Sequence, residues 1–352
     1  MGRSDATILL DADTRPIEAA LSALSRRRVT LGGVDAKAFT GPLGKINGSL
    51  GEFEKSLAAS NARVLAFGAS AGAIMALQRG FSELVKATIM VEKQLAQINV
   101  VLGASERNLA KFGNSLFEVA KNTEQSFEAV AEAATEFSRQ GLGMEKTLQR
   151  VQDAMILTRL TGLEVVDSVN AITAALNGFS SAALDSTQVI NKLIAVDQAF
   201  AVSGKDLAEA IRRVGSTAEG AGVSLEQLIA VVTSAQQITA RGGAVIGNSF
   251  KTIFTRLQRP RTLEALDQLG IKVKDLRGNV LPAMAMLENL AKGFDTLSQA
   301  QQSQVAELVG GVFQINVLKA SLKDLGREYS IYGSALGIAN SATNEASLRN
   351  EQ

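Results

Sequence analysis

The segment RGGAVIGNSFKTIFTRL, residues 241–257, contains two adjacent glycines, a third glycine four residues later and then an amphipathic run. Residues 242–249 match the phosphate-binding pattern G-x-x-x-x-G-K-[ST], except that Asn248 occupies the lysine position and Lys251 comes three residues too late. A phosphate loop also follows a buried strand, whereas residues 224–240, SLEQLIAVVTSAQQITA, have a helical pattern. A nucleotide site is therefore disfavoured, and the glycines need another explanation.

The composition indicates closely packed helices and excludes several chemistries. Of the 352 residues, 46% are hydrophobic but only 5% are aromatic, and there are just 4 prolines to interrupt helices. The chain has no Cys and no His, which removes thiol nucleophiles, imidazole bases, Cys/His zinc sites and disulfides. No motif for carboxylate or Ser/Lys catalysis is present either. We therefore expect no enzyme activity, no catalytic residue, no metal and no cofactor.

The charge is balanced, with a formal net charge of +1. A dedicated nucleic-acid-binding protein usually shows a basic excess. The densest basic spots are Arg26–Arg28 and the group Arg256, Arg259 and Arg261. Both are expected to be solvated surface, with contact to DNA or another polyanion as the alternative.

A long helical pattern covers residues 52–120 and includes an uncharged stretch, VLAFGASAGAIMALQ, at 64–78. Gly68 and Gly72 form a small-xxx-small face there, which would let another helix approach closely. Two interpretations stay open for this seam: helix packing in a bundle or oligomer, or a segment that enters a membrane. Fifteen uncharged residues are fewer than the ~20 that span a bilayer.

After residue 120 the predicted helices are short, and their starts are clear. Asp185 with Gln188, Ser203 with Asp206, and Ser224 with Gln227 occupy the N-cap and N3 positions of capping motifs. Glycines are expected to end several helices, namely Gly141, Gly162, Gly178 and Gly220. The predicted helices are 122–139, 144–160, 163–177, 185–201, 204–218, 224–240, 244–258, 282–296 and 312–337.

Little β-structure is expected beside these helices. Residues 6–13 are predicted to form one short N-terminal strand, and LGIKVKDLRGNVLP at 269–282 predicts a small β-hairpin near 271–281. The predicted fold is therefore predominantly all-α, with long N-terminal helices followed by a compact bundle of short capped helices. The predicted divisions are an N-terminal strand, helix and linker (1–51), a long helical segment (52–120), a helical core domain (121–337) and a polar tail (338–352).

An ordered set of segments from about 115 to 325 resembles the core region of the phage tail tape measure family. The resemblance covers about 200 residues, which is more than half of the chain. Each segment alone is weak, and the order of all of them carries the resemblance. The segments are FEVAKNTEQSFEAVAEAATEFSRQG (117–141), GMEKTL (143–148), GVSLEQLIAVVTSA (222–235), the glycine segment 241–257, the hairpin segment 269–282 and LSQAQQSQVAELVGGVF (297–313).

The resemblance implies a structural role for the glycine segment. In that family it joins two helices: Gly242 and Gly243 would end the helix 224–240, and Gly247 would start or pack the next one. Phe250 and Phe254 would lie on one apolar face of that next helix, together with Ile253 and Leu257.

The resemblance also implies a function: a protein in the lumen of the tail tube that sets tail length while the tube polymerises and is ejected before or with the DNA on infection. The implied partners are further copies of the chain, the tail tube protein, distal tail or baseplate hub proteins and assembly chaperones, with transient contact to phage DNA and the host membrane. It would be located in the virion tail, and in the host cytoplasm during assembly.

Alternative functions are a membrane-active, pore-forming helical protein and, less favoured, a tail-associated cell-wall hydrolase. Because residues 346–352, ASLRNEQ, end on a polar helical pattern without a cap, we also expect the chain to be the first part of a longer protein.

Overall fold

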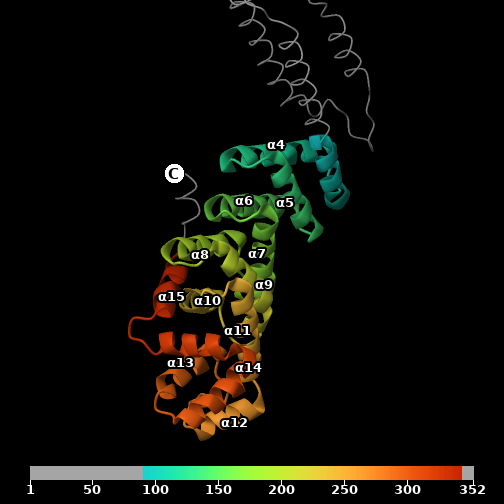
Figure 1. The fold of residues 1–352 in the computed structure, drawn as a ribbon. Helices are drawn as coiled ribbons and strands as arrows, with labels where there is room; N and C mark the ends of the chain where they lie inside the picture. Colours follow the sequence, from blue (N-terminus) through green and yellow to red (C-terminus); the bar gives the residue numbers. More distant parts are fainter. Residues whose placement is uncertain (1–89, 343–352) are drawn as a thin grey trace, which may run out of the picture. The chain divides into compact units, whose positions relative to one another are not determined.

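The computed structural model describes residues 90–342 of the chain (Figure 1). The chain divides into two units, and the larger one comprises Ala87–Gly103 and Ser115–Gln352. The described part of the smaller unit is residues 104–114, which lie largely in helix α4. The description below concerns the larger unit, within 90–103 and 115–342.

The fold of the described residues is α-helical, as predicted, and no strand occurs among them. Residues 90–102 are helical, and Gly103 ends them with a φ of 58°. The remaining elements are α4 (Glu106–Thr123), α5 (Phe127–Arg139), α6 (Met144–Thr161), α7 (Val165–Gly178), the 3-10 turn η2 (Ser180–Ala182), α8 (Ser186–Ala199), α9 (Gly204–Gly220), α10 (Leu225–Thr239), α11 (Gly243–Leu257), α12 (Pro260–Gln268), α13 (Ala283–Phe294), α14 (Gln299–Leu325) and α15 (Ile331–Ser341).

The helical segment predicted at 52–120 is helical where it is described, on both sides of Gly103, whose left-handed backbone cannot continue a helix. Two other predicted elements were wrong in detail. The expected helix 312–337 is two helices, since α14 ends at Leu325 and Ser330 caps α15. The expected hairpin is a turn with one antiparallel bridge, Lys274 to Val280. Its tip is held by Asp275, whose carboxylate accepts hydrogen bonds from the backbone N–H groups of Arg277 and Asn279, each at 2.9 Å or less.

The sequence analysis missed α12 and the first half of α14. Both begin on polar sequence, one with Pro260 in the first turn and the other with a capping box of Ser298 and Gln301. The predicted strand at 6–13 and the helices predicted before residue 90 lie outside the described residues. The predicted domain divisions stay predictions.

The predicted helix starts are confirmed at all three capping motifs. Reciprocal capping boxes join Asp185 to Gln188 and Ser224 to Gln227. At the third, Ser203 caps the N–H of Asp206, but the Asp206 carboxylate bonds elsewhere, as described below. Gly162 ends α6 in the left-handed conformation, as expected.

The helices of the larger unit form two rows (Figure 1). In one row α9 packs between α7 and α11, and α14 packs on the other side of α11. In the second row α8 packs on α6, and α15 lies against both α8 and α10. The core between the rows consists mainly of Ala, Val, Ile and Leu, with four fully buried phenylalanines, Phe137, Phe179, Phe250 and Phe254. Small side chains therefore set most of the helix spacings, as the composition predicts.

Buried polar groups attach α15 to the second row. Asp324 is fully buried and accepts hydrogen bonds from the Ser234 hydroxyl at 2.7 Å and from the N–H groups of Ile331 and Tyr332 at 3.0 and 2.9 Å. It thereby caps α15 from the end of α14. Lys192 on α8 pairs with Glu226 at 3.0 Å and donates to the Ala339 carbonyl at 3.1 Å.

A buried carboxyl lies between α6 and α8. Asp153 is 5% exposed, and its two oxygens accept from the Thr187 hydroxyl at 3.3 and 3.1 Å. Burial raises the pKa of Asp153 to about 6, and the neighbouring charge of Asp185 acts in the same direction. Hydrogen bonds from Ser186 and Thr187 oppose the rise. The native state therefore holds this proton more tightly than the unfolded chain does.

We expect Asp153→Asn to raise stability at pH 8 and to leave it nearly unchanged at pH 3.5. The pKa of Asp153 is about 6 in the folded state, above the ordinary value of 3.8. The free energy of unfolding therefore falls as pH rises from 3.8 to about 6, and it stays lowered at higher pH. An uncharged amide removes that loss of stability, which is about 1–3 kcal/mol. Urea unfolding of both proteins at the two pH values measures it. Asp267→Asn, at an exposed site on α12, serves as the control, and an equal gain in the control contradicts the assignment.

Candidate functional site

The glycine segment starts α11 without a side-chain cap of its own. Gly242 is the N-cap residue, with a φ of 80°, and Gly243 is the first helical residue. The prediction that these glycines end the preceding helix was wrong, because α10 ends at Thr239 and Ala240 takes the left-handed position. Ala240 does so with a φ of 50°, at a cost that glycine would avoid.

Side chains from two other helices supply the missing cap. The Gly243 N–H donates to an Asp206 carboxylate oxygen at 2.7 Å, across 37 residues of sequence. The other Asp206 oxygen accepts from the Ser203 hydroxyl at 2.7 Å. The Gly242 N–H donates to the Gln236 side-chain oxygen at 2.9 Å. The starts of α9 and α11 and the end of α10 are therefore joined through Asp206 and Gln236.

The glycines of α11 allow backbone contact with α9. A Cβ on Gly243 would overlap the main chain of Asp206, and one on Gly247 would lie 2.8 Å from the Ala210 Cα. Both contacts advance by four residues along each helix, so α9 and α11 run in the same direction with their first turns level. Gly247 thus packs the helix, one of the two roles expected for it.

On the opposite side of α9, glycines again allow backbone contact between two helices. A Cβ on Gly178 at the end of α7 would lie 3.2–3.3 Å from the backbone of Gly215 and Ser216 on α9. Gly178 was expected only to end α7. Its packing role was missed because the partner, Gly215, lies 37 residues away in sequence.

The apolar face predicted for α11 is buried. Phe250 and Phe254 are fully buried and stack on each other, with ring centroids 5.5 Å apart, and Ile253 and Leu257 are fully buried as well. These side chains belong to the core, and any further role for them in function stays a prediction.

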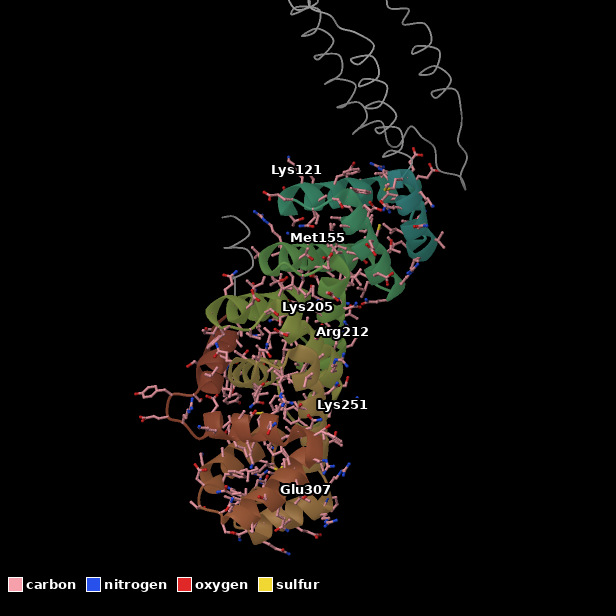
Figure 2. The ribbon with its side chains drawn as sticks, viewed as in Figure 1. Lys121, Met155, Lys205, Arg212, Lys251 and Glu307 are labelled. Carbon is pink, nitrogen blue, oxygen red and sulfur yellow. The ribbon has the colours of Figure 1, made fainter. Side chains whose placement is uncertain are left out.

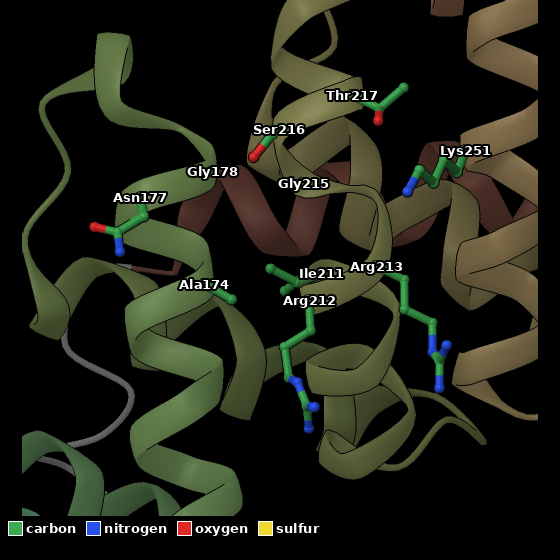
Figure 3. A pocket seen from close by; sticks show the side chains of 10 residues that line it. All are labelled: Ala174, Asn177, Gly178, Ile211, Arg212, Arg213, Gly215, Ser216, Thr217 and Lys251. Atoms are coloured by element: carbon green, nitrogen blue, oxygen red, sulfur yellow. The ribbon is translucent and has the colours of Figure 1, made fainter. Parts of the chain in front are cut away.

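A basic hollow of about 280 Å³ lies over α9 between α7 and α11 (Figure 3). Its ionisable lining residues are Arg212 and Arg213 on α9 and Lys251 on α11, and its other polar side chains are Asn177, Ser216 and Thr217. Figure 2 shows Arg212 and Lys251 along one edge of the row of helices. Arg212 forms a long ion pair with Asp167 at 3.9 Å, with 48% of the arginine side chain exposed. The sequence analysis did not single out these cations.

Arg256, expected on the solvated surface or in contact with a polyanion, instead supports a break in α14. Gly311 interrupts α14 with a φ of 66° and a ψ of 173°. The Arg256 guanidinium donates to the carbonyl groups of Glu307 and Leu308 just before it, at 3.4 and 3.3 Å. The two residues after the break, Val312 and Phe313, are 68% and 85% exposed.

By length and composition, α14 could cross a membrane, with a mean hydropathy of 1.3 over its most apolar window. Half of that window is buried inside the fold. Within residues 90–342, no group of three or more His, Cys, Asp or Glu side chains could hold a metal ion. The seam predicted at Gly68 and Gly72 lies outside the described residues.

We expect Gly243→Ala to destabilise the fold by about 3 kcal/mol or more, because its methyl group would overlap a backbone that cannot move independently. Gly247→Ala should cost less, since its nearest contact is longer. The matched control is Gly337→Ala in α15, where a Cβ meets nothing within 4 Å and a gain of up to about 1 kcal/mol is expected. Urea unfolding of the three variants ranks them, and equal effects at residues 243 and 337 would contradict backbone contact.

Comparisons with known proteins give a family match for the chain. The profile of the family described as phage-related minor tail protein matches residues 108–311, more than half of the chain. The match runs from within α4 to the break in α14, so it includes the glycine-packed row and the basic hollow. No solved structure matches.

Two curated relatives have tape measure names. The tape measure protein of Pneumococcus phage Dp-1 is 20% identical over 215 residues, which are 60% of this chain and 19% of that protein. The probable tape measure protein of Escherichia phage P2 is 28% identical over 109 residues, which are 30% of this chain and 13% of that protein. The match thus spans less than a fifth of either relative. These matches confirm the resemblance that the ordered segments indicated: the chain belongs to the phage-related minor tail protein family.

Proposed function

We propose that this chain acts as part of a phage tail tape measure protein, a structural component that sets tail length during tube polymerisation and leaves the tail on infection. The observation that carries the proposal is the family match over 108–311, supported by the names of the two relatives. The proposed partners are the tail tube protein, distal tail proteins, assembly chaperones and further copies of the chain, and the proposed location is the lumen of the tail tube.

The described fold favours a particular division of labour within such a protein. A ruler needs an extended shape, and a continuous helix contributes about 1.5 Å per residue. Residues 115–342 instead form short helices packed in two rows. We infer that this part is a folded module that anchors or organises the tape measure, and that tail length is set by residues outside it.

The membrane-active alternative is not favoured within the described residues. Its best support there is α14, whose apolar window is half buried and contains the break at Gly311. A cell-wall hydrolase has no supporting constellation among residues 90–342.

Tail length in mutant phages tests the proposal. A helical insertion of about 40 residues, placed outside the codons for residues 108–311, should lengthen tails by about 60 Å. Gly243→Ala should instead reduce the number of tails without changing their length, because it destabilises the module and leaves the ruler intact. Negative-stain electron microscopy gives both readouts, with Gly337→Ala phages as the control. Tails of unchanged length in viable insertion phages would overturn the proposed function.

A further inference from the structure

The strongest unassigned feature of the described residues is the basic hollow between α7, α9 and α11. Its lining includes three cations and no carboxylate, and the nearest ion pair, between Arg212 and Asp167, is 3.9 Å long and partly exposed. An exposed pair of that length contributes little and leaves most guanidinium donors available. With Asp167 counted, the three cations give a local formal charge of +2.

The hollow is held in a fixed shape by its floor. Gly178 and Gly215 bring α7 and α9 into backbone contact, and Gly243 and Gly247 do the same for α9 and α11. Three helices therefore hold residues that are far apart in sequence around the same hollow, namely Asn177, Arg212 and Lys251 (Figure 3). A ligand would not need to order the backbone before binding, which lowers the entropic cost of association.

Helix dipoles oppose an anion here but do not outweigh the side chains. The hollow lies near the end of α7, whose C-terminus has a partial negative charge of about −0.5. Arg212 and Arg213 lie about two turns before the end of α9, where the dipole effect has faded. Ser216 and Thr217 lie close to that end, so α9 also contributes a partial negative charge of about −0.5. The formal charge of +2 on the side chains exceeds the partial negative charges at the helix ends, so the hollow attracts anions.

The size and lining narrow the class of anion. The volume of about 280 Å³ is at or below the lower end of the range for small-molecule pockets, and no aromatic side chain lines it. A nucleoside base would therefore find no stacking surface. Guanidinium, ammonium, hydroxyl and amide groups are the donors that bind phosphate oxygens, and arginine can bind them through two parallel hydrogen bonds.

We propose that the hollow binds a phosphate group through Arg212, Arg213 and Lys251, with Asn177, Ser216 and Thr217 as neutral donors. The phosphate can come from free phosphate or from the backbone of nucleic acid, and the same chemistry serves both. Contacts to the phosphates of a nucleic-acid backbone carry no sequence information, so such binding is expected to be independent of base sequence.

The test uses the full chain and two probes, a fluorescein-labelled 20-base-pair DNA duplex in anisotropy titrations and inorganic phosphate in calorimetry. The hollow variant is Arg212→Gln/Arg213→Gln/Lys251→Gln. The matched control is Lys146→Gln/Lys272→Gln/Lys319→Gln, which removes the same charge at exposed sites outside the lining. Because all six side chains are exposed, both variants should keep native helicity, which circular dichroism checks. Lys251→Gln alone provides a milder variant.

The hollow variant should bind at least about tenfold more weakly at low salt, and the slope of log K against log salt should shrink by about 2–3. The control should lose no more than about threefold. If the hollow variant loses DNA binding, and inorganic phosphate competes with DNA for the native chain, the proposal is supported. The nucleic-acid backbone is then the source of the phosphate. Loss of phosphate binding alone supports the proposal with free phosphate as the ligand.

Three results would overturn the proposal. The first is no binding of either probe by the native chain. The second is an equal loss in the hollow and control variants, which would reflect net charge alone. The third is hollow-dependent binding of polyglutamate without binding of either phosphate probe, which would identify an acidic protein segment as the ligand.

Discussion

The hydrogen bond from the Gly243 N–H to the Asp206 carboxylate is the contact around which the described fold is arranged. A helix that begins with two glycines has unsatisfied N–H groups and no side chain to cap them. Here a carboxylate 37 residues earlier supplies the cap. The same absence of side chains lets α11 lie against the backbone of α9. The two glycines therefore leave the start of α11 without a cap of its own. They also let α11 come close enough to α9 for Asp206 to supply that cap.

The two rows of helices are held together by different means. In the row of α7, α9 and α11, glycines on both sides of α9 give backbone contact, which leaves little freedom in spacing or register. In the second row, buried Asp153 and Lys192 join helices through specific hydrogen bonds, and Asp324 on α14 joins the first row to α10 and α15. Such groups are costly to bury, so each must find its partners for the row to form. The first row thus combines backbone contact with the hydrogen bond from Gly243 to Asp206, whereas the second relies mainly on buried polar side chains.

The features that the sequence predicted well are local ones. The capping boxes at Asp185 and Ser224 depend on residues three positions apart, so the pattern alone identifies them. The face of Phe250 and Phe254 follows from helical periodicity. Asp206 was placed at the right position of its helix, but its partner could not be known, because no local pattern connects it with Gly243. The basic hollow was missed for the same reason: Arg212 and Lys251 lie on different helices, and only the packing of glycines brings them together. The predicted helix 312–337 begins at the break at Gly311 but runs past the end of α14 at Leu325, where Ser330 caps a separate helix.

The attachment of α15 has a consequence for how the chain is made. Lys192 on α8 donates to the carbonyl of Ala339, 147 residues later, and α15 covers faces of α8 and α10 that leave the ribosome long before it does. Roughly one hundred residues separate the ends of α10 and α15, which takes about 5–20 seconds to translate at typical rates. During that interval the apolar faces of α8 and α10 are open to neighbouring chains. The order of synthesis therefore sets the risk that the apolar faces of α8 and α10 associate with another chain. The stability of the finished fold does not reduce this risk.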